Sequence, residues 1–370
     1  MEREKINRLK EILSIPTHYS NNGEERLRNF IIEWATIRGL ECYVDKIKNV
    51  YITKGRSDFY PCVVSHIDSV HLITPIHIEE EIYDFKEEKY NRQNDGKLIL
   101  RGYRENEGIF KSTRTGCGGD DKCGVFLALE LIDKFDNIKG AFFVSEEIGC
   151  IGSRQADPEF FKDVAYTIQH DSPENDTISW FSSGEQLFTD DWASSNVVTD
   201  DDDQKRFNGK IGDLLYKHGV RTFARHPYTD VSQIRQKFDF QCINLPAAYY
   251  RYHTKDEYVL IEGIEVAEQL SIDIIERLGC EKQIYIEEKL EINDNNGWPN
   301  YYQAYGYANV KPSTAEILKS KVKSYFTKKY KMTDDDFNFL YEGLHNYVDE
   351  FTEESISNIV DEYFESPFYS

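Results

Sequence analysis

The amino-acid sequence predicts an α/β fold, a three-layer sandwich in which a mixed, mostly parallel sheet is flanked by helices. The first observation is a set of short apolar runs bounded by polar residues, such as 61–65 and 163–170, which are typical of strands buried on both faces. The second is that these runs alternate with helix-like segments over roughly residues 1–280, as in folds built on a parallel sheet. With 370 residues, the chain is long enough for one large domain or two ordinary ones.

The predicted helices are segments in which apolar residues recur at helical spacing. One of them, 24–39, ends at Gly39, a common helix stop, and another, 122–135, is apolar on nearly all sides, as expected of a helix packed on a sheet. The full set comprises residues 3–14, 24–39, 122–135, 210–220 and 264–279.

The predicted strands are compact apolar or β-branched runs, the clearest of which is PCVVS at 61–65. The full set comprises residues 41–47, 49–55, 61–65, 139–145, 163–170 and 240–245.

The composition changes after Cys280. Residues 292–310 are rich in Asn, Gly and Tyr and indicate an irregular connector, and three helix-like segments follow, two of them capped by Thr333 and Thr352. We therefore predict a main domain over residues 1–280, followed by a connector and a small helical C-terminal appendage over residues 281–370.

The charge and the cysteines narrow the possible classes of protein. Acidic residues outnumber basic ones by 66 to 44, giving a net charge of −22, and such a surface repels nucleic acids and anionic membranes. The N-terminal segment is charged and amphipathic rather than a signal peptide, and no apolar stretch is long enough to span a bilayer. The seven cysteines are odd in number, show no C-x-x-C spacing and lie mostly in apolar runs, which indicates reduced thiols. We expect a soluble cytoplasmic protein.

Short motifs of acidic residues and histidines, mostly placed after apolar runs, carry the functional prediction. They read VVSHIDSV (63–70), GCGGDDKCGV (116–125), FFVSEEIGCIGS (142–153), AYTIQHDSP (165–173) and YRYHTKDEYV (250–259). Together they offer the two imidazoles and the carboxylates that a pair of divalent cations needs, and they leave one glutamate over as a base. Any one of them could be a surface loop or a helix cap, but their ordered series is hard to obtain by chance.

The residue types within these motifs suit a metal site. His66 and Asp68 alternate at the end of a predicted strand, so His66 can face a metal while Asp68 approaches its other ring nitrogen. Glu146 and Glu147 directly follow a buried strand and repel each other unless a cation or a proton relieves them. One glutamate can bind a cation while the other accepts a proton from water.

The series resembles that of the co-catalytic zinc peptidases of the M20/M28 type, and most closely the peptidase T (tripeptide aminopeptidase) branch. In that family the order is H-x-D, G-x-D-D-K-x-G, E-E-I-G, an Asp after a strand, and H-x-K-x-E. The segments EILSIPT, NNGEERLRNFIIEW and NVYITKG also resemble the family's opening helices and first hairpin. The similarity covers about residues 1–280, which would form the zinc-peptidase catalytic domain.

Carried over residue by residue, the resemblance implies two metal sites with one shared carboxylate. The first metal is assigned to His66, Asp120 and Asp171, and the second to Asp120, Glu147 and His253. Glu146 would be the general base and acid, and Asp68 would orient His66. The resemblance also implies a cis peptide bond between Asp120 and Asp121. At Asp171 the chain departs from the family, because Ser172 and Pro173 follow where the family commonly has Gly.

A second departure lies between Asp171 and His253. Peptidase T members insert a whole lid and dimerisation domain at this place. In this chain the residues between Asp171 and His253 must also supply part of the catalytic sheet, and they are too few to form a separate domain as well. We therefore expect the lid to be missing or reduced to a loop near 176–209, with an open cleft. The chain would then be a monomer or an oligomer that does not depend on the lid, and tripeptide specificity does not carry over.

The sequence thus predicts a metal-dependent exopeptidase, an aminopeptidase or dipeptidase that hydrolyses short peptides. Its cofactors would be two divalent cations, zinc in the first place, with cobalt or manganese as alternatives. Two other readings stay open, namely an amidohydrolase that deacylates N-acyl amino acids on the same scaffold and a non-catalytic metal-binding homologue. The presence of Glu146 and of a complete ligand set argues against the non-catalytic reading.

Several other residues have weaker functional signals. His226 and Tyr228 could polarise a substrate carbonyl or could simply stabilise a loop. His170 should point to the opposite side of its strand from Asp171 and is expected to be structural. The remaining histidines have no metal-like context; they are His18, His71, His77, His218 and His345.

Overall fold

The computed structural model describes residues 1–18, 23–71, 77–106, 109–183, 185–194, 207–226 and 228–286. Met1–Glu288 forms one compact unit. The predicted connector and C-terminal helices, from residue 287 on, lie outside the described residues.

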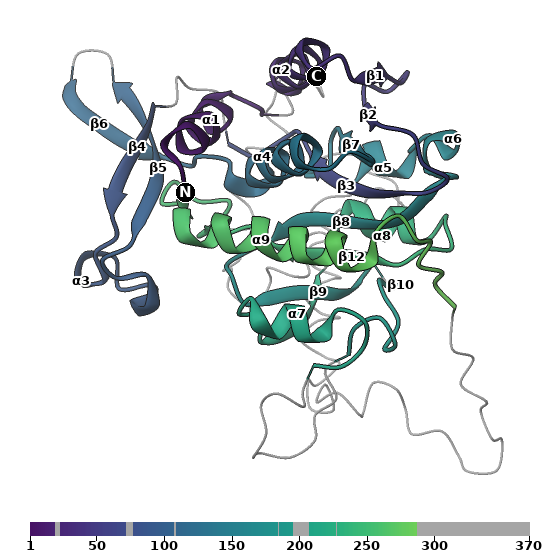
Figure 1. Cartoon of the computed structure of the whole chain (residues 1–370). Helices are drawn as coiled ribbons and strands as arrows, with labels where there is room; N and C mark the ends of the chain where they lie inside the picture. The colour runs from purple at the N-terminus through teal and green to yellow at the C-terminus, as the bar shows by residue number, and fades with distance from the viewer. Residues whose placement is uncertain are drawn as a thin grey trace, which may run out of the picture. The chain divides into compact units, whose positions relative to one another are not determined.

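A mixed nine-stranded sheet forms the centre of this unit, in the order β1-β2-β7-β3-β8-β12-β9-β10, with β11 beside β9 (Figure 1). The strands are β1 (Glu41–Val44), β2 (Val50–Lys54), β3 (Tyr60–His66), β7 (Ile138–Phe143), β8 (Val164–Ser172), β9 (Thr177–Ser182), β10 (Glu185–Gln186), β11 (Thr222–His226) and β12 (Cys242–Pro246). The four central strands β7, β3, β8 and β12 run parallel, whereas β1, β2 and β10 pair antiparallel with their neighbours. The predicted mixed sheet with a parallel centre is confirmed.

Helices cover both faces of this sheet. α4 (Gly119–Lys134) packs on β3 and β8, with α1 (Arg3–Ser14) and α9 (Ile261–Leu278) beside it. α8 (Asp230–Arg235) packs on β3, β8 and β12 together with α5 (Ile151–Arg154). Further helices near this sheet are α2 (Gly23–Ile37), which packs on β1 and β2, α6 (Pro158–Phe161) and α7 (Gly212–Lys217).

Two adjacent residues of β8 show that α8 and α9 lie on opposite faces. The side chain of Gln169 accepts a hydrogen bond from the backbone N–H of Val231 in α8, at 3.0 Å. The side chain of His170 lies 2.8 Å from the hydroxyl of Ser271 in α9. Because successive strand residues face opposite sides, the sheet is enclosed between two helical layers, as the predicted three-layer sandwich requires.

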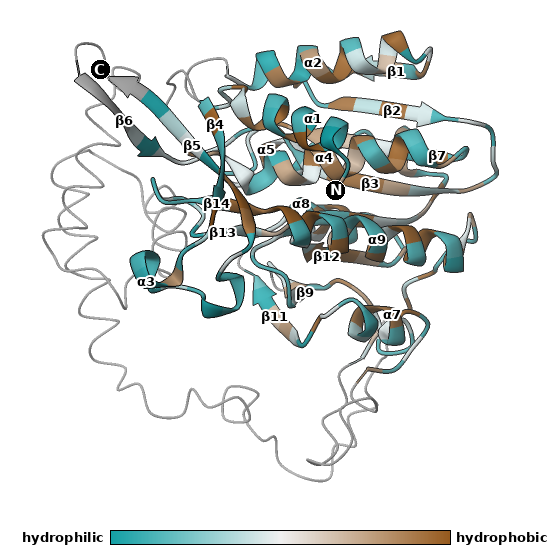
Figure 2. Ribbon diagram, turned by 60° about the vertical axis from the view of Figure 1, so that its left-hand side comes forward, coloured by the Kyte–Doolittle hydropathy of each residue, from teal (hydrophilic) through white to brown (hydrophobic). Residues whose placement is uncertain are grey.

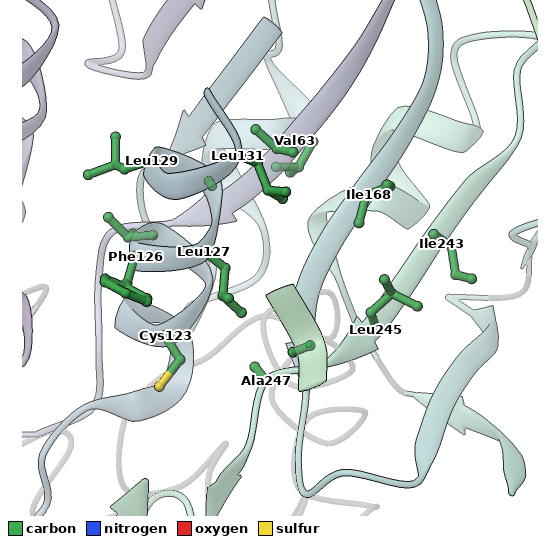
Figure 3. Close-up of a cluster of buried hydrophobic side chains, with 14 of the residues drawn as sticks. Val63, Cys123, Phe126, Leu127, Leu129, Leu131, Ile168, Ile243, Leu245 and Ala247 are labelled. Carbon is green, nitrogen blue, oxygen red and sulfur yellow. The ribbon is translucent and has the colours of Figure 1, made fainter. Parts of the chain in front are cut away.

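The core explains why these segments form strands and helices. Every residue of β3 and of β8 is buried, as expected for central parallel strands covered on both faces. Leu127 and Leu131 of α4 lie opposite Val63 of β3 and Ile168 of β8 (Figure 3), and all four side chains are almost fully buried. Figure 2 shows the same pattern, since β3 is largely brown and hydrophobic.

A second, antiparallel sheet of five strands was not predicted. Its order is β13 (Tyr249–Tyr250), β14 (Tyr258–Leu260), β5 (Leu98–Asn106) and β4 (His77–Ile82), with β6 (Ile109–Thr115) paired to β5. β4 reads HIEEEI and is mostly hydrophilic (Figure 2), so it lacks the apolar run by which the other strands were found. β4 is held in place by its pairing with β5, which includes a contact of 3.3 Å between Glu81 and Arg101. The short helices α3 (Phe85–Glu88) and η2 (Arg92–Asn94) follow β4.

Most of the described residues between Asp171 and His253 belong to the large sheet and its helices, namely β9, β10, α7, β11, α8 and β12. β13, just before His253, belongs to the second sheet, and these described residues form no separate domain. The prediction of a loop near 176–209 is wrong for the first part of that range. Thr177–Ser182 forms strand β9, which pairs with β11 and β12. The run TISWFS places Ile178 in the core, and this single buried anchor did not stand out in the sequence.

All seven cysteines are unpaired, and five of them are buried. Among the described helices, none has the length and apolar composition required to cross a membrane.

Leu127→Ala should lower the free energy of unfolding by about 2–5 kcal/mol, because it removes a fully buried side chain between α4 and the sheet. Urea unfolding followed by circular dichroism measures this change. As a control, Ile37→Ala removes a side chain that is 74% exposed and should change the value by about 0.5 kcal/mol or less. Equal effects of the two substitutions would contradict the described packing of α4.

Candidate metal centre

The residues predicted to form the site converge at one edge of the large sheet. His66 ends β3, Glu146 and Glu147 follow β7, and Asp171 lies near the end of β8. These parallel strands end at the same edge, where α/β sheets usually bind ligands. Two further segments complete the site, namely the start of α4 with Asp120 and the turn between β13 and β14 with His253.

One carboxylate lies between the two histidines. The Nε2 atom of His66 is 3.2 Å from Oδ1 of Asp120, and the Nε2 atom of His253 is 3.2 Å from Oδ2 of the same residue. Asp171 Oδ1 lies 3.7 Å from His66 Nε2, and Glu147 Oε2 lies 3.2 Å from His253 Nε2. The structure therefore brings together the two groups of residues that the resemblance paired, with Asp120 between them.

The donor set fits divalent cations. One ligand atom each from His66, Asp120 and Glu147 lies within 4.8 Å of the others, and carboxylate oxygens with imidazole nitrogens are the ligands that zinc takes in hydrolases. Glu147 Oε1 is buried and has no hydrogen-bond partner among the described residues. An unpaired buried carboxylate oxygen is costly, and a bound cation would satisfy it.

The electrostatics of the site also favour positive charge. Burial, and next the neighbouring Asp120, raise the pKa of Glu147 to about 7. Burial lowers the pKa of His253, but Asp120 and Glu147 outweigh it and raise that pKa to about 12. Neighbouring carboxylates contribute to both shifts, and the negative charge that they bring to this edge would attract a cation as it attracts protons.

The turn that presents Asp120 is fastened to β3 by the next residue. The peptide bond between Asp120 and Asp121 is cis, as the resemblance implied. Asp121 Oδ2 accepts hydrogen bonds from the Ser65 hydroxyl at 2.6 Å and from the His66 backbone N–H at 3.2 Å. Its Oδ1 accepts from the backbone N–H of Gly124 at 3.1 Å. Asp120 thus faces the histidines while Asp121 anchors the turn.

Asp68 contacts more of the site than predicted. Its Oδ1 lies 3.3 Å from His66 Nδ1, a contact rather than a well-aligned hydrogen bond, which places it beside the ring as expected of an orienting residue. Its two oxygens also accept hydrogen bonds from the backbone N–H groups of Glu146 at 2.9 Å and Glu147 at 3.1 Å. One buried carboxylate therefore lies beside the imidazole and holds the turn that carries the two glutamates.

Asp171 is held by neighbours despite its departure from the family pattern. Its Oδ2 accepts from the side-chain amide of Gln169 at 3.2 Å, and its Oδ1 accepts from the Tyr249 hydroxyl at 3.4 Å. Its backbone N–H donates to Asn244 on the adjacent strand β12 at 2.8 Å. These bonds direct the carboxylate towards His66.

The two weaker candidates, His170 and His226, have different surroundings. His170 faces α9 and bonds Ser271, away from the site, so the structural interpretation is confirmed. The His226 ring contacts the backbone carbonyl of Tyr228 through Nδ1 at 2.6 Å, which uses one ring nitrogen to stabilise the loop. Its ring also lies close enough to Asp171 to lower the pKa of that carboxyl, against the larger effect of burial.

Comparisons with known proteins agree with the fold. No family model and no curated protein matches the chain. Among solved structures, a tripeptidase from Staphylococcus aureus is 14% identical and an aminopeptidase PepT from Bacillus cereus is 15% identical. Each similarity covers 74% of this chain and 98% of the other chain, with a TM-score of 0.50. The chain has the fold of these peptidases. The predicted resemblance to peptidase T is confirmed at the level of the fold.

Three residues near the site were missed in the sequence. Asp230 is fully buried beside Glu146, whose pKa it helps to raise, and neither of its oxygens has a well-aligned donor among the described residues. Thr229-Asp230 reads as an ordinary helix cap with a first-turn acid, so only its place after a strand could have pointed to it. His71, for which no role was predicted, has its Nε2 at 2.8 Å from Glu257 Oε2. Glu257 in turn contacts the Asp120 turn.

Added zinc should raise the midpoint of thermal unfolding of the metal-free chain, since a ligand that binds only the folded state stabilises it. Zinc at about 100 times its dissociation constant corresponds to about 2.7 kcal/mol. Asp120→Asn should abolish most of this increase, because Asp120 contacts both histidines. Asp58→Asn, at an exposed position before β3, is the matched control and should retain the increase. An undiminished increase in Asp120→Asn would contradict the assigned centre.

Proposed function

We propose that this chain is a metal-dependent exopeptidase that hydrolyses short peptides, as an aminopeptidase or a dipeptidase. The observation that carries the proposal is the position of Asp120 between two histidines, each of which also faces a further buried carboxylate. We assign the activity to a catalytic domain formed by residues 1–280. The fold shared with a tripeptidase and an aminopeptidase supports this assignment.

Two divalent cations, zinc in the first place, would be held by the two groups of residues described above. His66, Asp120 and Asp171 would hold the first, and Asp120, Glu147 and His253 the second. Bound zinc supplies Lewis acidity, which polarises a carbonyl and makes water a nucleophile at neutral pH.

We assign the proton transfers of the reaction to Glu146. Its Oε2 lies 3.9 Å from His66 Nε2, close to the centre but farther from His66 than Asp120 is. Burial raises the pKa of Glu146 well above its usual value, and Asp171, Asp230 and Glu147 add to the rise while His66 opposes it. A carboxylate with a raised pKa accepts a proton from water more readily and can return it to the leaving amine.

The surroundings hold Glu146 in that position. Its backbone N–H donates to Asp68 Oδ1 at 2.9 Å, and the thiol of Cys150 lies 3.4 Å from its Oε1. The preceding residue, Ser145, has a left-handed backbone with φ of 56° and donates its N–H to Glu24 at 2.7 Å. The turn is thus fixed from β3 and from α2, which limits movement of the base.

Because the described residues between Asp171 and His253 form no separate domain, we propose that substrate binding does not depend on a lid. The same consideration favours a monomer, or an oligomer assembled without a lid. Substrate would then be fixed mainly by the metal centre and nearby loops, which gives broad selectivity among short peptides.

Glu146→Gln should reduce kcat by roughly 10²–10⁴-fold while leaving the zinc content nearly unchanged, because the amide cannot accept a proton. Glu147→Gln should instead weaken zinc binding, because it removes one charge from the pair with His253. Zinc content after dialysis and peptide turnover are measured on the same samples. Glu159→Gln, whose side chain is 80% exposed, is the matched control. Equal zinc loss in both site variants would show that the two glutamates are assigned the wrong way round.

A substrate panel tests the proposed class directly. The purified full chain, loaded with zinc, cobalt or manganese, should hydrolyse dipeptides and tripeptides with a free α-amine, and Glu146→Gln should not. The same peptides with an acetylated α-amine are the comparison set. Cleavage confined to the acetylated set would favour the deacylase reading, and cleavage of neither set would contradict the proposed activity.

A further inference from the structure

A buried glutamate outside the proposed ligand set links two parts of the metal centre. Glu257 ends the turn between β13 and β14, four residues after His253, and is fully buried. Its Oε2 accepts a hydrogen bond from the backbone N–H of Gly118 at 2.6 Å, and its Oε1 accepts from that of Asp120 at 3.4 Å. One carboxylate thus holds both N–H groups that flank Gly119, in the turn that presents Asp120.

This link joins segments that must meet accurately. Asp120 and His253 lie far apart in the sequence, yet His253 Nε2 is 3.2 Å from Asp120 Oδ2. Glu257 belongs to the His253 turn, where its own N–H donates to the carbonyl of Thr254 at 3.2 Å. A shift of Glu257 would therefore move the Asp120 turn relative to His253.

His71 lies behind this carboxylate. Its Nε2 is 2.8 Å from Glu257 Oε2, in a contact rather than a well-aligned hydrogen bond, and its side chain is only 12% exposed. Glu257 therefore faces two backbone N–H groups on one side and the imidazole of His71 on the other, and backbone N–H groups form their stronger hydrogen bonds with an ionised carboxylate.

The glycines of the same turn make room for these two side chains. A Cβ atom at Gly116 would lie 1.8 Å from Cε1 of His71, a distance that no side chain could adopt without displacing the ring. A Cβ atom at Gly119 would lie 2.7 Å from Cβ of Tyr249 and 3.4 Å from Oε1 of Glu257. The glycine-rich motif before Asp120 thus allows His71 and Glu257 to approach the backbone.

We propose that Glu257, backed by His71, is a positioning residue of the metal centre that sets the separation of Asp120 and His253 and thereby the affinity for the second metal. The inference rests on the proposed metal centre. Neither Glu257 nor His71 is proposed to contact substrate. Their role is to hold the backbone that carries the ligands, as residues around a metal site commonly do.

Zinc binding to the metal-free full chain, measured by competition with a chromophoric chelator in the absence of peptide, tests the proposal. Glu257→Gln keeps the size of the side chain but cannot accept from both N–H groups, and it should weaken zinc binding roughly 10–100-fold. His71→Gln should weaken it less. The double variant should bind zinc about as weakly as Glu257→Gln alone, because His71 acts through Glu257.

Two matched controls carry the same chemical changes away from the turn. Glu262→Gln alters a residue whose side chain is 61% exposed in the first turn of α9, and His77→Gln alters an exposed residue of β4. Both should bind zinc as the unaltered chain does. Circular dichroism of the metal-free variants shows whether each remains folded, and His71→Gln, which leaves both hydrogen bonds of Glu257 in place, covers the case in which Glu257→Gln does not fold.

Zinc affinity unchanged in folded Glu257→Gln and His71→Gln would overturn the proposal, as would a loss of thermal stability with no loss of affinity. A chain that binds no zinc even when unaltered would overturn the proposed function together with this inference. Zinc binding weakened in the variants of a chain that cleaves no peptide would support the inference while contradicting the proposed activity.

Discussion

The mutual repulsion of buried carboxylates at one edge of the large sheet is the constraint on which the rest of the structure depends. The chain neutralises some of them with its own groups. Asp121 and Asp68 accept backbone N–H groups, and the pKa of Asp120, which burial would raise, is lowered by its two histidines. Others are left with few donors, so the pKa of Glu147 and that of Asp230 are both raised to about 7, chiefly by burial. Among these acids, Glu147 belongs to the proposed ligand set, and a bound cation would supply the positive charge that the chain itself does not.

The central sheet and the ligand set could be predicted because both depend on local patterns. Strands β3 and β8 are apolar runs buried at every position, and the acidic and histidine motifs stand where such runs end. Once the strands are taken as parallel, their carboxyl ends must share an edge, which brings His66, Glu147 and Asp171 together without knowledge of the loops. The histidine on the distant β13–β14 turn could be placed only through the family resemblance, since no periodicity links residue 253 to the others.

What could not be predicted depends on tertiary contacts without a local signature. β4 is a strand because β5 pairs with it, although its three consecutive glutamates resemble a solvated segment. Asp230 and His71 are ordinary polar residues in the sequence, and Glu257, although it ends the H-x-K-x-E motif, had no role assigned. Each gains its place from a group far along the chain. For Glu257 the partner is a backbone N–H, which every residue but proline carries, so residue identity gives no hint of the pairing.

The strand order has a consequence for the assembly of the centre during synthesis. β3 lies between β7 and β8, which are both synthesised after it. β3 therefore stays unpaired on these two sides until the later strands are made, and its pairing with β8 requires synthesis to have passed residue 164. The last member of the group around Asp120 is His253, shortly before α9. A growing chain therefore carries its acids for most of its synthesis without the second imidazole. The centre can close only when nearly the whole compact unit has left the ribosome, so premature metal capture by a partial chain would involve an incomplete set of ligands.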